Sequence, residues 1–181
     1  MYSIILDLEA TCWNETIQNR EQEIIEIGAC RVDPYGKIEN TFSRLIRPQK
    51  YPLLSSYCKQ LTGIEQNDLD RAKKFEIVFD EFLNWCEYDE GNSLRIFTWG
   101  KTDLQLLTNA CEIANLEMDW LEEFIDMKAV FARIKGLPKR VGLDKALLIE
   151  NFEFEGNRHR ALPDALNLAK IFVRYFEEFN E

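Results

Sequence analysis

The chain has 181 residues, of which 46% are hydrophobic and only eight are glycine, and its formal net charge is −10. This length and composition indicate a single globular domain with a sizeable core, and they exclude an intrinsically disordered chain. The acidic balance disfavours a protein that grips long nucleic acids through many phosphates.

The first third of the chain predicts three strands. One is expected over residues 2–9 and a second over residues 23–32, where apolar residues dominate. The segment 33–36 contains proline and glycine where a chain reversal needs them. Residues 37–46 are therefore expected to return as a third strand and to complete a hairpin.

The rest of the chain alternates helices with strands. In chain order we expect a helix from Phe75, a break at Gly91-Asn92, a strand over 94–99, a helix from Asp103, a strand over 123–126, a helix ending near Gly136, a helix over 142–150 and a final helix from Ala161. The side chains that the final helix is expected to bury are Leu162, Ala165, Leu166, Ala169, Phe172, Val173 and Phe176. Three strands followed by this alternation predict an α/β fold with a mixed sheet flanked by helices.

Four acids and one histidine carry the chemical signal. Asp7 and Glu9 lie two apart on the first strand, so their side chains share one face. Two carboxylates so close raise each other's pKa unless a cation lies between them, and oxygen ligands suit hard ions such as Mg²⁺ or Mn²⁺. Asp103 and Asp164 add two further acids, and His159, the only histidine, lies five residues before Asp164. The set indicates a metal-dependent phosphodiesterase.

The contexts of these residues resemble the motifs of the DEDDh family of 3′-to-5′ exonucleases, named for four acids and a histidine. Asp7 to Thr11 resembles the first motif, Phe97 to Asp103 the second and His159 to Asp164 the third. Tyr57 to Ile64 and Gly142 to Leu147 resemble segments of the Eri-type branch, which trims RNA 3′ ends. The resemblance extends from about residue 3 to residue 176. It implies one exonuclease domain over residues 1–181 with a ribonuclease-H-like fold, a mixed five-stranded sheet flanked by helices.

The resemblance also implies a role for each of the five residues. Asp7 would bridge two divalent ions, Mg²⁺ or Mn²⁺, while Glu9 and Asp164 would hold the ion that activates water and Asp103 would support the second ion. His159 would be the general base, since an imidazole accepts a proton at neutral pH. A lone histidine is more often structural, but its place in the third motif favours catalysis. Pro163 departs from the family, which often has a second aspartate there, although that neighbour is not a metal ligand.

Contacts with the terminal nucleotide follow from the same resemblance. Backbone amides at Ala10 and Thr11 would face the ribose. The apolar wall for the terminal base would consist of Leu61, Thr62 and Ile64. A helix end capped by Gly63 explains that segment equally well and does not exclude the wall. Trp99 could stack a base or lie in the core, with equal weight for each.

Basic residues cluster in two places. The first cluster consists of Arg133, Lys135, Lys139, Arg140 and Lys145, for which a solvated face is an equal alternative to substrate contact. Arg158 and Arg160 flank His159 and are expected to meet phosphate. With a net charge of −10, we expect few phosphates to be held, all near one strand end.

The sequence contains no signs of a membrane or secreted protein. No segment reaches the roughly 18 apolar residues that span a bilayer, and no basic region or cleavage site precedes the first strand. The five cysteines are dispersed without a Cys-x-x-Cys pair, which predicts reduced thiols, mostly in the core, and disfavours structural zinc. We therefore expect a cytoplasmic protein, and nothing in the sequence indicates a protein partner.

We expect a 3′-to-5′ exonuclease that acts on single-stranded nucleic acid, RNA in preference to DNA, and releases nucleoside 5′-monophosphates. One alternative is a DNA-directed exonuclease on the same fold, and another is a non-catalytic nucleic-acid-binding module. The complete set of acids with His159 disfavours the binding module, because a mere binder has no reason to gather four carboxylates. A failure to release nucleotides in the presence of Mn²⁺ would favour it.

Overall fold

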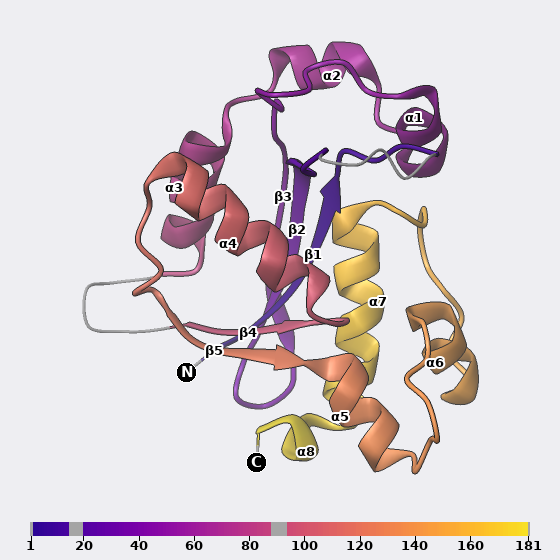
Figure 1. Cartoon of the computed structure of the whole chain (residues 1–181). Coiled ribbons are helices and arrows are strands. Elements are labelled where there is room, and N and C mark those ends of the chain that lie inside the picture. Colours follow the sequence, from indigo (N-terminus) through magenta and orange to yellow (C-terminus); the bar gives the residue numbers. More distant parts are fainter. Residues whose placement is uncertain (1, 15–19, 88–93, 181) are drawn as a thin grey trace.

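The computed structural model describes residues 2–14, 20–87 and 94–180. Within them the chain forms a five-stranded sheet of order β3-β2-β1-β4-β5 (Figure 1). The strands are β1 (Ser3–Ala10), β2 (Ile24–Val32), β3 (Ile38–Leu45), β4 (Leu94–Thr98) and β5 (Leu121–Asp126). The helices are α1 (Ser56–Thr62), α2 (Gln66–Arg71), α3 (Phe75–Trp85), α4 (Thr102–Ala114), α5 (Met127–Ile134), α6 (Leu143–Ile149), α7 (Ala161–Arg174) and α8 (Phe176–Asn180). The predicted α/β fold with a mixed five-stranded sheet is confirmed.

Strand β1 lies at the centre of the sheet. It pairs antiparallel with β2, which pairs antiparallel with β3, and it pairs parallel with β4, which pairs parallel with β5. The predicted hairpin between β2 and β3 is confirmed, and the Asp33 carboxylate accepts the Tyr35 and Lys37 amides in its turn, both at 2.8 Å. Parallel neighbours require crossover connections, which α1 to α3 and then α4 provide.

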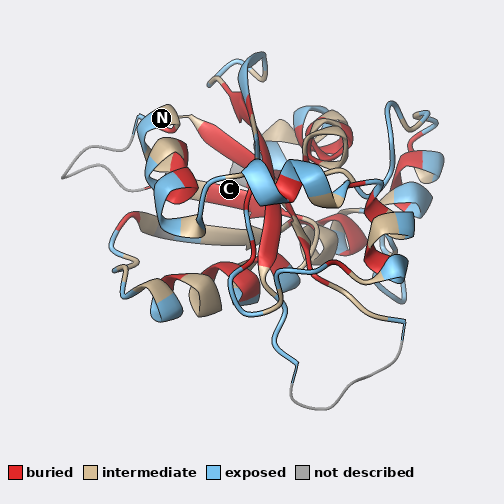
Figure 2. Ribbon diagram, turned by 90° about the horizontal axis from the view of Figure 1, so that it is seen from above, coloured by how far each residue is buried: buried red, intermediate tan, exposed pale blue. Residues whose placement is uncertain are grey.

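Apolar layers cover both faces of the sheet. On one face, Leu6 and Leu8 of β1 join a core with Phe79 and Phe82 of α3. On the other face, Ile5 joins a separate core that includes side chains of α5, α7 and α8. Figure 2 shows the buried strands enclosed by helices whose outer surfaces are exposed. Because side chains alternate along a strand, the odd-numbered acids of β1 lie on the face that α7 covers.

The first turn of α7 lies directly on β2. Gly28 permits this approach, because a Cβ atom there would lie 2.1 Å from the Ala161 carbonyl carbon. The buried face predicted for this helix is only partly right: Val173 is 40% exposed, whereas Leu168 and Ile171 are buried. A 3.6-residue period indicates an apolar stripe but not its edges, and here the sheet and α8 determine which side of α7 is covered.

Some features were not predicted as elements or remain undescribed. Helices α2 and α8 were not predicted, and with six residues or fewer they are too short for a clear helical period. Of α1, the sequence predicted only the end capped by Gly63. The break predicted at Gly91-Asn92 lies outside the described residues. The five cysteines are free thiols, and all except Cys12 are buried. Among the described residues, no helix is long and apolar enough to cross a membrane.

Candidate active site

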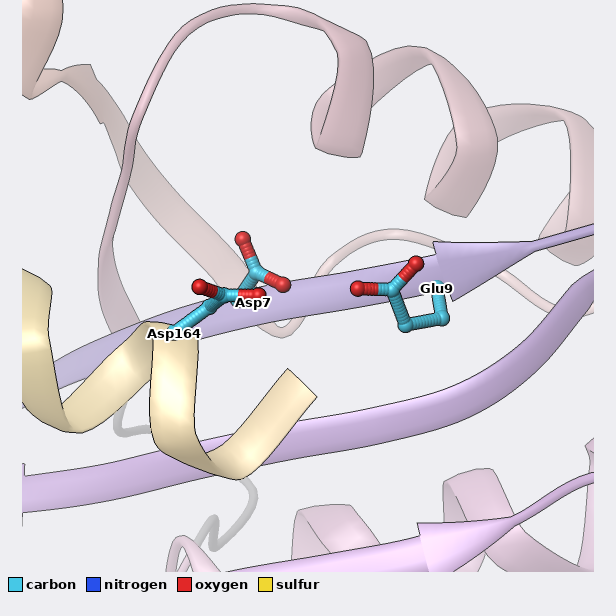
Figure 3. A group of neighbouring side chains, drawn as sticks. All are labelled: Asp7, Glu9 and Asp164. Carbon is cyan, nitrogen blue, oxygen red and sulfur yellow. The ribbon is translucent and has the colours of Figure 1, made fainter. Parts of the chain in front are cut away.

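Three carboxylates converge at the junction of β1 and α7. Asp7 and Glu9 project from one face of β1, and Asp164 projects toward them from the first turn of α7 (Figure 3). Each residue offers one oxygen atom, and these atoms all lie within 4.8 Å of one another. The two-residue spacing on a strand and the packing of α7 onto β2 thus assemble a group of oxygen donors.

Asp103 joins this group through the backbone of β1. It is the second residue of α4 and is only 8% exposed. Its Oδ1 atom accepts a hydrogen bond from the Leu8 amide at 3.2 Å, between the two acids of the strand. Asp103 lies outside the close group of three, but after burial its charge contributes most to the raised pKa of Asp7.

Burial raises the pKa of all four carboxyl groups. It raises the pKa of Asp7 well above its usual range, with further contributions from the charges of Asp103, Asp164 and Glu9. The pKa rises to about 8 for Glu9, to about 7 for Asp103 and to about 6 for Asp164, in each case chiefly through burial. Four acids that resist ionisation together fit a site for a divalent cation, since hard cations prefer oxygen ligands and offset their repulsion.

His159 lies in the loop that precedes α7, and its side chain is exposed. Its backbone adopts the left-handed conformation, with φ of 58°, which is uncommon outside glycine. Its charge and the backbone amides of His159 and Arg160 favour the ionised form of Asp164, although burial has the larger effect on that pKa. The structure therefore places His159 beside one of the three converging acids.

Thr11 does not present a free amide to a nucleotide, contrary to the expectation from the sequence. It is 2% exposed, and its amide donates to the Glu23 carbonyl at 2.9 Å. Its Oγ1 atom accepts the Glu23 amide, and its carbonyl accepts a hydrogen bond from Gln22, both at 2.9 Å. Thr11 thus joins the end of β1 to the start of β2 by hydrogen bonds. A backbone contact with the ribose remains a prediction for the neighbouring Ala10 alone.

The segment predicted as an apolar wall is mostly a helix end. Thr62 and Ile64 are each 3% exposed, and the Thr62 hydroxyl donates to the Cys58 carbonyl at 2.8 Å. Gly63 ends α1 in the left-handed conformation with φ of 67°, so the alternative of a glycine-capped helix is confirmed. Leu61 is the one half-buried member of the three, and it alone retains surface for a terminal base.

The structure gives Trp99 a packing role. Its indole N–H donates to the Val141 carbonyl at 3.1 Å, and its ring lies 5.7 Å from that of Phe131. The side chain is half-buried against the core on the α7 face. Of the two possibilities that the sequence left open, these contacts favour the core, and base stacking remains a prediction.

The basic residues expected to meet phosphate have acidic partners. Arg158 Nε donates to Asp144 at 3.0 Å. Arg160 donates to Glu26 through two nitrogens, Nε to Oε2 at 3.0 Å and Nη2 to Oε1 at 2.7 Å. The Arg160 guanidinium is therefore paired with β2, while the side chain remains 33% exposed, and its contact with phosphate stays a prediction. In the first basic cluster, the pairs with acidic residues are Arg140 with Asp126 and Lys135 with Glu150.

Glu26 and Gly28 support the site by seating α7 on the sheet, and the sequence motifs did not indicate either residue. Both lie on β2, where Glu26 is 1% exposed and is the register partner of Glu9. The signal was present as one acid within the apolar run from Ile24 to Ile27. A buried acid in such a run requires a nearby partner, and here that partner is Arg160, 134 residues further along the chain.

The family model and the relatives that match this chain are all exonucleases by name. Residues 4–172 match the model of the exonuclease family RNase T. ERI1 exoribonuclease 2 of Homo sapiens is 31% identical over 191 residues, which cover 94% of this chain and 28% of that protein. The probable 3′-5′ exonuclease KapD of Bacillus subtilis is 32% identical over 172 residues, which cover 93% of this chain and 82% of KapD. The chain thus spans 28% of the length of the first relative.

A solved structure extends the similarity to the backbone. The nuclease domain of 3′hExo, a DEDDh family member bound to rAMP, is similar to this chain with a TM-score of 0.90 and 28% sequence identity. The match covers 98% of this chain and 92% of that domain.

Proposed function

This chain belongs to the RNase T exonuclease family, and we propose that it is a metal-dependent 3′-to-5′ exonuclease of single-stranded nucleic acid, with RNA preferred. The observation that carries the proposal is the convergence of Asp7, Glu9 and Asp164 within 4.8 Å, with Asp103 bound to the backbone between the first two. All 181 residues belong to one exonuclease domain in this proposal.

The four acids would hold two divalent ions, Mg²⁺ or Mn²⁺. When bound, such ions activate water and stabilise charge on the attacking and leaving oxygens. The chain's own contribution is to gather carboxylates whose pKa values are raised by burial and by the charges of neighbouring acids. Ligands must be ionised, so metal uptake releases the protons that Glu9 and Asp103 retain near neutral pH.

His159 is the proposed general base. Its exposed imidazole lies at the start of α7, where it can receive a proton from water and pass it to solvent. Asp164 would stabilise the imidazolium that forms, since the two residues interact electrostatically in the fold. The left-handed backbone at His159 holds this side chain on the loop rather than on the helix.

RNA is the proposed substrate because proteins similar to this chain are named for RNA or described with a ribonucleotide. ERI1 exoribonuclease 2 is named for action on RNA, and the 3′hExo domain is described with a ribonucleoside monophosphate. Cleavage from a 3′ end that breaks the bond to the 3′ oxygen releases a nucleoside 5′-monophosphate of that kind. Because the net charge is −10, we propose that few phosphates are held and that the substrate is released between cuts.

The test uses end-labelled single strands of RNA and DNA with identical sequence, each incubated with Mn²⁺, with Mg²⁺ or with excess chelator. We expect shortening from the 3′ end, 5′-monophosphate products, faster cleavage of RNA and no cleavage in chelator. Asp7→Asn is the matched control, because it removes one charge at nearly constant volume. Faster cleavage of DNA would favour the DNA-directed alternative. Binding of strands without product would favour the non-catalytic module, and full activity in chelator would contradict the metal mechanism.

A further inference from the structure

Glu26, buried on β2, binds both the first amide of α7 and the guanidinium of Arg160. Its Oε2 atom accepts the Ala161 amide at 3.0 Å, and the same carboxylate accepts both Nε and Nη2 of Arg160. Ala161 is the first residue of α7, where amides have no partner within the helix. The Arg160 side chain makes no cap of its own, so Glu26 supplies the missing acceptor from another strand.

The register of the sheet places this contact beside the metal ligands. Glu9 of β1 is the cross-strand partner of Glu26, and Asp7 is the partner of Gly28. Glu26 and Gly28 share a face two residues apart, so one binds the first turn of α7 while the other lets its backbone approach. The first turn also carries Asp164, whose distance from β1 therefore depends on this seat on β2.

The same contact determines where the Arg160 charge lies. The guanidinium is close enough to Glu9 to lower the pKa of that carboxyl, although burial raises it by more. Because Glu26 binds both Nε and Nη2 of Arg160, the guanidinium charge is held against β2.

We propose that Glu26 is a positioning residue for the metal centre. It sets the position of Asp164 by capping α7, and it holds the Arg160 guanidinium against β2. The inference rests on the proposed function and adds to it a residue that touches neither a metal ion nor the substrate. Residues behind the direct ligands commonly change metal affinity or activity by about 10–100-fold when mutated.

A purely structural role must be separated from this one, because loss of any buried ion pair destabilises a fold. The chain offers a matched control at the opposite end of the same helix. Glu150 is 5% exposed and accepts Arg174, the last residue of α7, at 3.0 Å. A helix rises about 1.5 Å per residue, so this pair lies roughly 20 Å from the first turn of α7. Glu150→Gln therefore removes an equivalent charge without disturbing the seat of Asp164.

The experiment compares Glu26→Gln, Glu150→Gln and the unchanged protein. Titration calorimetry with Mn²⁺ alone measures ion affinity without any turnover, and urea unfolding measures stability. We expect both variants to lose stability, but only Glu26→Gln to bind Mn²⁺ about 10–100-fold more weakly. On a short RNA, kcat at a fixed Mn²⁺ concentration should fall for Glu26→Gln, while KM for RNA should change little because Glu26 is only 1% exposed.

Each outcome decides the matter. If the unchanged protein binds Mn²⁺ and cleaves RNA while Glu26→Gln retains its Mn²⁺ affinity, or loses no more than Glu150→Gln, the positioning role is wrong and the proposed function stands. If the unchanged protein neither binds Mn²⁺ nor cleaves, the proposed function itself fails. Should Glu26→Gln not fold, Arg160→Lys replaces it, because a lysine keeps the charge but cannot form the two-nitrogen pair. That variant should weaken Mn²⁺ binding by more than about threefold, and unchanged affinity would overturn the inference.

Discussion

In the absence of divalent ions, the free energy of unfolding should fall as the pH rises from 6 to 8. Burial raises the pKa of Glu9 to about 8 and that of Asp103 to about 7. In an unfolded chain both carboxyl groups have a pKa near 4. Between these limits the metal-free fold retains protons that the unfolded chain has already lost.

The sign and the size of the effect follow from this difference. A group with a raised folded pKa contributes its full stabilisation below the unfolded pKa, and that contribution is lost as the pH rises through the folded pKa. Each retained proton lowers the free energy of unfolding by about 1.4 kcal/mol per pH unit. Near pH 6.5 both groups are mostly protonated in the fold, so the slope should be about −2 to −3 kcal/mol per unit. Glu9 itself should contribute about −1.2 kcal/mol per unit at pH 7 and about −0.7 at pH 8, with a further loss from Asp7.

The assay is urea unfolding at half-unit steps of pH, in EDTA and in saturating Mn²⁺. The decline should appear in EDTA and be much smaller with Mn²⁺, since a bound cation compensates the ionised ligands. Glu9→Gln should make the decline above pH 7 shallower, because it removes the carboxyl with the pKa of about 8. A free energy of unfolding in EDTA that stays constant or rises between pH 6 and 8 would refute the reasoning.

Three further predictions concern turnover and binding. Asp7→Asn should be the most severe single change among the acids, measured as nucleotide release in Mn²⁺, because the charges of all three other acids act on Asp7. A milder loss than for Asp103→Asn would contradict this. His159→Ala should lower kcat by roughly 10²–10⁴-fold with RNA affinity largely retained, and a variant that loses affinity but keeps kcat would make His159 a phosphate contact. Binding of a single strand to Asp7→Asn should show a log–log salt slope of about −1.5 to −3, which corresponds to roughly two to four phosphates. A slope steeper than about −4 that grows with strand length would reveal an extended groove.

The acids of the site were predictable because short-range rules place them. Alternation along β1 puts Asp7 and Glu9 on one face, and a helix that begins near residue 161 carries Asp164 on its first turn. The strands and the longer helices were predictable for the same reason, since their periods extend over enough residues to be recognised. Asp103 could be placed at the start of a helix, but its bond to the Leu8 amide could not be foreseen.

The contacts that the sequence did not reveal depend on partners distant in sequence. Arg160 has the composition of a phosphate contact, but its partner is Glu26, which lies on a strand near the other end of the chain. Thr11 is the last residue of the first motif, yet its hydrogen bonds go to Gln22 and Glu23, because β1 and β2 remain joined past the acids. Local patterns indicate which groups are polar, whereas only the fold determines which partner each one meets.

The seat of α7 on β2 has a consequence for the order of events during synthesis. Glu26 and Arg160 are 134 residues apart, and the helix that they anchor brings the last acid and the histidine to the first two acids. A nascent chain can hold β1 and β2 long before α7 has left the ribosome, but it then has an incomplete set of ligands and no base. Contacts of such separation close only when the intervening chain has folded. Under the proposed function, hydrolysis therefore waits until the residues of α7 have been made and have packed on β2.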